Sequence, residues 1–182
     1  MDLEVHEYDL GVKVLTPKIN NDKRGFVSEI FRNDWTGFFG KDVPNQINIS
    51  KSSPGVIRAW HRHQRDQTDF FTVVKGTMKI CIYDSDNESK TFGKLVEIVA
   101  SEKKLQVIKV PGKFWHGTKT TSDEDSYTIY FINNIFKLNL NKSKIGLVSF
   151  TNAFMKKNSE SSFWNTFIAD RPISVYMITP KA

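Results

Sequence analysis

Short apolar runs separated by turn residues fill the middle of the chain, and they limit most strongly how it can fold. Between residues 70 and 132 these runs are rich in β-branched and aromatic residues. No stretch before residue 135 has the period of a long amphipathic helix. Many short strands with regular turn signals are typical of antiparallel sandwiches and barrels. The sequence therefore predicts an all-β fold.

Two hairpins are expected from the turn residues. Lys75-Gly76 separates the runs Phe70–Val74 and Thr77–Asp84, and Pro111-Gly112 separates a second pair of runs, at 105–110 and 114–120. Tight turns with glycine between two strand-like runs are the usual signal of a hairpin. Further strands are expected at Val12–Leu15, Phe26–Phe31, Leu95–Val99 and Tyr127–Ile132.

Length and composition set the domain organisation. The 182 residues suffice for a single domain over 1–182, in which the Asn-, Lys- and Ser-rich segment 136–182 packs on the barrel and is partly helical. The first residues carry acidic side chains and no long apolar stretch, so we expect no leader peptide, no membrane partner and a cytoplasmic location. The net charge is +6, but the lysines are spread out, which favours a small anionic ligand such as a sugar nucleotide over nucleic acid.

Three of the four histidines lie in two short aromatic-rich segments. His61 and His63 belong to Gly55-Val-Ile-Arg-Ala-Trp-His-Arg-His63, and His116 belongs to Pro111-Gly-Lys-Phe-Trp-His-Gly117. Histidine titrates near neutral pH and is also the commonest metal ligand. The same residues therefore allow an acid–base site or a metal site.

Six motifs in order resemble the dTDP-4-dehydrorhamnose 3,5-epimerase family. The resemblance covers roughly residues 8 to 136. The motifs are Asp22-Lys-Arg-Gly-Phe-Val-Ser-Glu29, Gln46-Ile-Asn48, Gly55-Val-Ile-Arg-Ala-Trp-His61, Val74-Lys-Gly76, Ser89-Lys-Thr-Phe-Gly93 and Pro111-Gly-Lys-Phe-Trp-His-Gly117. The resemblance implies a cupin-type antiparallel jelly-roll barrel, a homodimer, and epimerisation of a nucleotide-linked 4-keto-6-deoxy sugar without a metal or other cofactor.

The resemblance also implies roles for individual residues. His61 would be the catalytic base and Tyr130 the acid, with Tyr127 as the fallback. The residues implied in substrate binding are Arg24 and Arg58 at the diphosphate, Phe26 and Glu29 at the thymine, and Gln46, Asn48 and His116 along the nucleotide and sugar. A guanidinium can bind two diphosphate oxygens at once, which suits the two arginines.

The chain departs from the family pattern at Asp69, in the shorter loop from His61 to Asp69, where Arg62-His63 follows the predicted base, and in the C-terminal segment. Asp69 stands where the family usually has a lysine near the sugar ketone. A carboxylate cannot stabilise an enolate as an ammonium group does. The family's motifs are also missing from 137–165, so only position suggests that Asp170 orients His61.

These departures leave two alternatives to the epimerase. His61, His63, Asp69 and His116 approximate the ligand set of metal-dependent cupin enzymes, and two histidines at i and i+2 on a strand point to one side. A sugar-nucleotide-binding protein without activity is the other alternative. Metal content would distinguish the metal-dependent enzyme from the epimerase, and turnover would distinguish the inactive binding protein from it.

Overall fold

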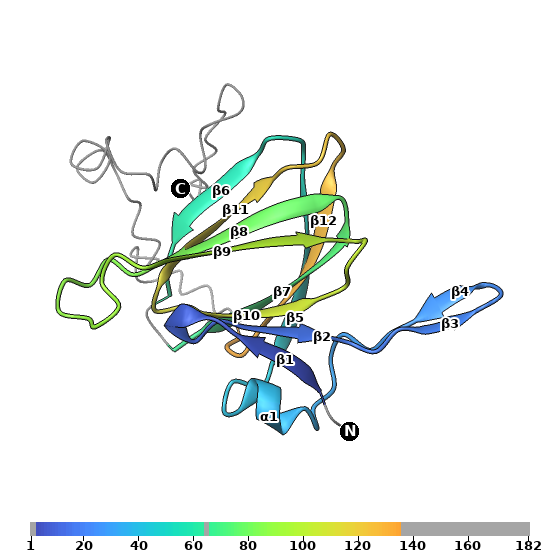
Figure 1. The fold of residues 1–182 in the computed structure, drawn as a ribbon, viewed down its shortest axis with the longest axis horizontal. Coiled ribbons are helices and arrows are strands. Elements are labelled where there is room, and N and C mark those ends of the chain that lie inside the picture. Colours follow the sequence, from blue (N-terminus) through green and yellow to red (C-terminus); the bar gives the residue numbers. More distant parts are fainter. Residues whose placement is uncertain (1–2, 64–65, 136–182) are drawn as a thin grey trace.

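Two facing β-sheets and a projecting hairpin make up the structure, a computed structural model that describes residues 3–63 and 66–135 (Figure 1). The expectation of an all-β fold is confirmed. The two sheets are not closed into a barrel, since no described strand of one sheet pairs with a strand of the other. The C-terminal segment expected over 136–182, including Asp170, lies outside the described residues.

The larger sheet has six strands in the order β1-β2-β10-β7-β12-β5, and the smaller has four in the order β6-β11-β8-β9. The six are β1 (Glu4–Glu7), β2 (Lys13–Thr16), β5 (Gln46–Ser52), β7 (Thr68–Lys75), β10 (Val107–Pro111) and β12 (Ser126–Ile132). The four are β6 (Ile57–His61), β8 (Thr77–Tyr83), β9 (Leu95–Ser101) and β11 (Trp115–Thr120). The remaining elements are the hairpin of β3 (Asn20–Asp22) and β4 (Gly25–Val27), the single-turn helix α1 (Thr36–Phe39) and the 3-10 turn η1 (Asp9–Gly11).

The main core lies between the two sheets, and a second core covers the other face of the six-stranded sheet. Phe71 and Val73 of β7 point into the main core, together with Ile80 and Ile82 of β8. Phe70 points the opposite way, into a cluster capped by the aromatic side chains around α1. β7 is buried on both faces from Thr68 to Val73, so its sequence lacks the apolar–polar alternation of a strand with one face in solvent.

Both predicted hairpins are wrong as strand pairs, although the chain does turn at each place. β7 pairs with β10 and β12, whereas β8 pairs with β9 and β11. β10 likewise pairs with β2 and β7, and β11 with β6 and β8. Each turn therefore carries the chain from one sheet to the other. Turn residues specify a reversal of the chain, but burial of the apolar faces between the sheets decides the partner strand.

The turn between β7 and β8, which takes the chain from one sheet to the other, requires a glycine at position 76, and this requirement can be tested. The φ of Gly76 is +73°, and an added Cβ would lie 2.8 Å from Ser122 Oγ and 3.0 Å from the backbone oxygen of Asp125. We expect Gly76→Ala to lower the free energy of unfolding, measured with urea, by more than about 1 kcal/mol. Gly93→Ala is the matched control, because φ there is +79° but nothing lies within 4 Å. Equal losses in the two variants would show that the close contacts at Gly76 do not matter.

The described helices are short. None of them, within the part of the chain that the structure describes, is long and apolar enough to cross a membrane.

Candidate active site

Three histidines and one aspartate meet between the two sheets. His61 of β6 pairs directly with His116 of β11 in the four-stranded sheet, and their ring centroids are 4.3 Å apart. His116 also pairs with Ile82, which belongs to the main core, so both histidines face the six-stranded sheet. His63 follows the end of β6, and Asp69 lies on β7 in the opposite sheet. One potential ligand atom from each residue lies within 4.8 Å of the others.

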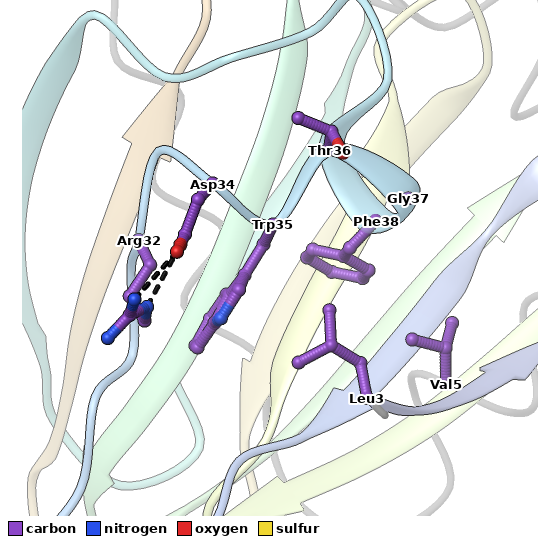
Figure 2. Close-up of a pocket in the computed structure, with 8 residues that line it drawn as sticks. All are labelled: Leu3, Val5, Arg32, Asp34, Trp35, Thr36, Gly37 and Phe38. Carbon is purple, nitrogen blue, oxygen red and sulfur yellow. Dashed lines mark hydrogen bonds and ion pairs between the residues drawn. The ribbon is translucent and has the colours of Figure 1, made fainter. Parts of the chain in front are cut away.

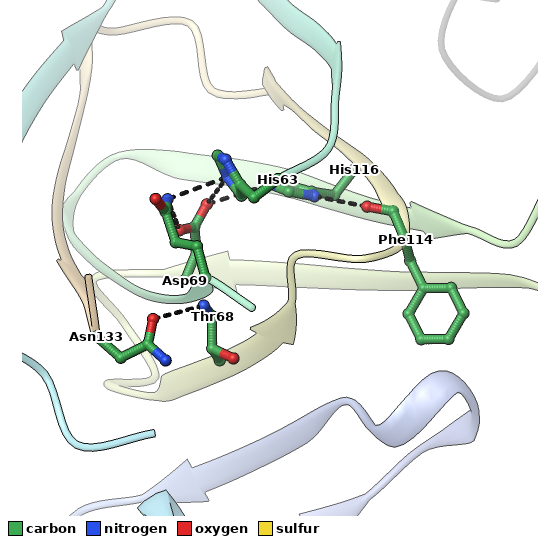
Figure 3. Close-up of polar contacts among 7 residues, drawn as sticks. His63, Thr68, Asp69, Phe114, His116 and Asn133 are labelled. Atoms are coloured by element: carbon green, nitrogen blue, oxygen red, sulfur yellow. Dashed lines mark hydrogen bonds and ion pairs between the residues drawn. The ribbon is translucent and has the colours of Figure 1, made fainter. Parts of the chain in front are cut away.

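Asp69 is the centre of the polar contacts in this cluster (Figure 3). Its Oδ2 lies 2.9 Å from His63 Nε2 and 3.2 Å from His116 Nε2. Gln67 donates from Nε2 to Asp69 Oδ1 at 2.8 Å. Burial alone would raise the pKa of Asp69, but the hydrogen bonds and positive charge of His116 and His63 hold it well below the ordinary carboxyl range. Asp69 is therefore a buried carboxylate that fixes two imidazole rings.

His61 differs from the other two histidines because its ring makes no hydrogen bond within 3–63 and 66–135. Burial, followed by the positive charge of His116, lowers its pKa to about 3, against the opposing effect of Asp69. An imidazole with that pKa is neutral at neutral pH and has a free lone pair. His61 can therefore accept a proton from a bound molecule.

Tyr130 faces the same space from the opposite sheet. It lies on β12, where it pairs with Phe71 of β7 and Asn48 of β5, and it packs against the main core. Burial and then the charge of Asp69 raise the pKa of the phenol, and Arg58 opposes this change. Tyr127, by contrast, has its ring 6.0 Å from Lys51 Nζ on the edge strand β5. Of the two tyrosines, Tyr130 is the one that the structure packs against the main core.

Polar side chains continue the inner surface along β5 and β6. Gln46 and Asn48 are two residues apart on the inward face of β5, and Gln46 donates from Nε2 to Asn48 Oδ1 at 2.8 Å. Arg58 of β6 donates from Nε to Ser52 Oγ at 2.8 Å and from Nη2 to the Lys51 carbonyl oxygen at 3.0 Å. These contacts connect the edges of the two sheets. The inner surface thus offers amide and guanidinium groups next to the histidines.

Arg24, Phe26 and Glu29 are not brought to the histidine cluster. Arg24 and Phe26 lie on the hairpin of β3 and β4, which projects away from both sheets (Figure 1), and Glu29 follows it. The Arg24 side chain is 91% exposed and forms an ion pair with Asp22, two residues away, and Phe26 is 60% exposed. The hairpin thus presents an exposed aromatic ring and an exposed guanidinium, and among the described residues the guanidinium pairs with Asp22 of the same hairpin.

A family profile described as dTDP-4-dehydrorhamnose 3,5-epimerase matches residues 10–148. The chain belongs to this family. It is 40% identical over 125 residues to a probable low-salt glycan biosynthesis epimerase of Haloferax volcanii, and the match covers 69% of this chain and 79% of the relative.

Solved structures of dTDP-4-dehydrorhamnose 3,5-epimerases have the same fold. The enzyme from Sulfolobus tokodaii is 30% identical with a TM-score of 0.67, and the match covers 76% of this chain and 78% of that one. A Legionella pneumophila epimerase, solved in complex with dTDP-4-keto-L-rhamnose, is 26% identical with a TM-score of 0.68, over 75% of this chain and 74% of that one. The predicted family, its cupin-type fold and the isomerase class are therefore confirmed. The metal-dependent enzyme and the inactive binding protein are not favoured.

Gln67 also contacts this cluster, although the sequence does not predict it as a site residue. Its amide contacts both Asp69 Oδ1, at 2.8 Å, and His63 Nε2, at 3.2 Å. Positions i and i+2 on a strand point to one side, so the spacing of Gln67 and Asp69 was an available signal. Asn133, after β12, accepts from the backbone N–H of Thr68 at 2.8 Å and so fixes the start of β7 beside Asp69 (Figure 3).

A separate cavity lies away from the histidines, on the outer side of the six-stranded sheet (Figure 2). Arg32 and Asp34 form an ion pair at its edge, and Trp35 and Phe38 form its wall. It contains none of the residues that the sequence predicts for the epimerase site. This cavity is therefore separate from the residues that the sequence predicts for the epimerase site.

Proposed function

We propose that the protein epimerises a nucleoside-diphosphate 4-keto-6-deoxy sugar at carbon 3, carbon 5 or both. The observation that carries this proposal is the position of His61. Its imidazole is neutral, makes no hydrogen bond within the described residues, and faces the sheet that carries Tyr130. A base on one side of a sugar ring and an acid on the other are what inversion at carbon requires.

The first step is removal of a proton from carbon next to the ketone. Such a proton becomes acidic only when a neutral base contacts it and the negative charge developing on the ketone oxygen is stabilised. His61 takes the proton, and the electron pair of the broken C–H bond moves to the ketone oxygen. Arg58 and His116 lie next to this space and would bind the enolate and the diphosphate. This chemistry calls for no cofactor.

The second step is return of a proton to the opposite face of the carbon. A phenol has an ordinary pKa of about 10, and that of Tyr130 is raised further by burial. Tyr130 therefore keeps its hydrogen at neutral pH and can give it to the enolate carbon. His61, on the other sheet, then loses its proton to solvent, and the Tyr130 phenolate takes a proton from solvent, which completes the cycle.

The projecting hairpin supports a homodimer in which each chain completes the other's site. Arg24, Phe26 and Glu29 would bind the nucleotide in the partner's site, where Gln46 and Asn48 line the inner surface. The exposed Phe26 ring would stack on the base, and Arg24 would bind the diphosphate. We further propose that 1–182 is a single cytoplasmic domain, with neither nucleic acid nor membrane as partner.

A mixing experiment tests this exchange of hairpins. The single variant His61→Ala and the double variant Arg24→Ala with Phe26→Ala should each be inactive or nearly so. Mixed and allowed to exchange subunits, they should recover about a quarter of wild-type activity, because half of the dimers are mixed and each has one complete site. No recovery, with subunit exchange verified by mass spectrometry, would show that the hairpin serves its own chain.

The reaction itself is tested by proton NMR of dTDP-4-keto-6-deoxyglucose in deuterated water with chelator-treated protein. Deuterium entering carbon 3 or carbon 5 is the expected result, and the labelled position identifies the epimerised centre. Nucleotide-sugar binding without any exchange would count against the proposed reaction.

A further inference from the structure

Asp69 is a buried carboxylate whose ion pairs, within residues 3–63 and 66–135, are both with histidines. Its side chain is 6% exposed, and it contacts His63 and His116. A carboxylate is stable away from water only when hydrogen bonds and a neighbouring positive charge replace its hydration. The counter-charge of Asp69 is therefore expected on one of these two imidazole rings.

His116 is the ring whose two nitrogens both face acceptors (Figure 3). Its Nδ1 lies 3.0 Å from the carbonyl oxygen of Phe114, and its Nε2 lies 3.2 Å from Asp69 Oδ2. A neutral imidazole has one N–H, whereas an imidazolium donates from both nitrogens. Because a carbonyl oxygen can only accept, Nδ1 carries a hydrogen. The hydrogen of the second contact then belongs to His116 or to Asp69.

The other contacts of Asp69 favour His116 as the owner of this hydrogen. His63 Nε2 lies 2.9 Å from the same Oδ2, and the Gln67 amide donates to Oδ1 at 2.8 Å. Several donors around one carboxyl group favour its charged form. Against the effect of burial, the hydrogen bonds of His116 and His63 keep the pKa of Asp69 well below the ordinary carboxyl range. His63 needs only one hydrogen for its contact, so the positive charge falls to His116.

A charged His116 would lie next to the proposed base. The ring centroids of His116 and His61 are 4.3 Å apart. Burial lowers the pKa of His61 most, and the charge of His116 lowers it further, by more than Asp69 raises it. The pair of Asp69 and His116 thus presents a net positive field at the place where an enolate would form. Such a field stabilises the developing negative charge.

We propose that Asp69 is a positioning residue that holds His116 as an imidazolium, and that this cation stabilises the enolate in place of the lysine usual at position 69. The inference rests on the proposed epimerisation and identifies the source of its positive charge. Both N–H groups of His116 bind within the protein, so the cation acts on the enolate through its field. His116 keeps its proton throughout the cycle, and His61 stays available as the base.

The protonation of His116 can be measured directly by two-bond proton–nitrogen NMR. Full-length protein labelled with ¹⁵N-histidine is studied without substrate at about pH 8, where an ordinary imidazole with a pKa of about 6.5 is mostly neutral. The chain has four histidines, and the signals of His116 are those lost in His116→Gln. We expect both of its ring nitrogens to have the chemical shifts of N–H nitrogens. A neutral His116 would overturn the inference.

Asp69→Asn tests the role of the carboxylate. The new amide can donate to His116 Nε2, so the ring should become neutral at the same pH. Deuterium exchange into the 4-keto sugar should fall by a factor of about 10², with nucleotide affinity within a few-fold of the wild-type value. Asp84→Asn is the matched control, because Asp84 is also buried but accepts from Thr91 Oγ1. Its exchange rate and its His116 signals should be unchanged.

The outcomes separate the parts of the inference. A His116 that stays charged in Asp69→Asn would overturn the role of Asp69, and a neutral His116 with exchange at the wild-type rate would overturn the role of the charge. If thermal unfolding shows that Asp69→Asn does not fold, the spectrum of the wild-type protein still decides the charge of His116. Absence of exchange in the wild-type protein would overturn the proposed reaction, and the NMR spectrum is read without substrate, so the two failures are distinguishable.

Discussion

Replacing His61 with alanine is expected to reduce deuterium incorporation into the 4-keto sugar by a factor of about 10² to 10⁴, the usual contribution of a general base. His61 is the histidine of the cluster whose ring makes no hydrogen bond within the described residues, and its lowered pKa keeps it neutral. The variant removes the proton acceptor but none of the groups proposed to bind the nucleotide. Exchange is measured by proton NMR in deuterated water, and nucleotide binding by calorimetry.

Nucleotide binding is the control that separates chemistry from folding in His61→Ala. The dissociation constant should stay within a few-fold of the wild-type value, because Arg24, Phe26, Gln46 and Asn48 are unchanged. A variant that binds the nucleotide and retains full exchange would rule out His61 as the base.

Replacing Tyr130 with phenylalanine is expected to separate exchange from inversion. The ring and its packing on Phe71 are kept, with the centroids 6.2 Å apart in the native protein, and only the hydroxyl is lost. His61 can still remove the proton and return deuterium to the same face. We therefore expect deuterium to enter the substrate while the rate of forming the inverted sugar falls by a factor of about 10² or more.

Tyr127→Phe is the matched control for this prediction, because it removes the same hydroxyl on the same strand from a ring beside Lys51. It should leave inversion unchanged. If Tyr127→Phe lost inversion and Tyr130→Phe kept it, the acid would be Tyr127 and not Tyr130.

The positions of the strands around the two cores can be predicted from the sequence, but which strands pair with one another cannot. Alternation and β-branched residues predict β8, β9 and β12 well, because those properties are local. Pairing depends on which faces are buried together, so the turns at Gly76 and Gly112 predict hairpins although the adjoining strands belong to different sheets. The run Phe26–Phe31 was also predicted too long, since β4 ends at Val27. β1 and β5 were not predicted, because edge strands carry a weak apolar pattern.

Parts of the candidate site were readable in the same way. The motif around His61 and that around His116 gave the two histidines that the structure pairs on neighbouring strands. The sequence shows that Asp69 departs from the lysine usual in the family. Its contacts with both His63 and His116, however, depend on the distance between two sheets, which no local pattern encodes. The exposure of Arg24 and Phe26 is likewise a property of the folded chain.

The proposed base and the proposed acid belong to different sheets, with His61 on β6 and Tyr130 on β12. Their separation is therefore set by the thickness of the packed layer between them, to which Val73 and Ile80 contribute. In the proposed mechanism, the apolar interior would therefore set the width available to the sugar ring. Trimming or enlarging that interior should change turnover without touching the substrate, so in this fold the packing of hydrocarbon is part of the catalytic apparatus.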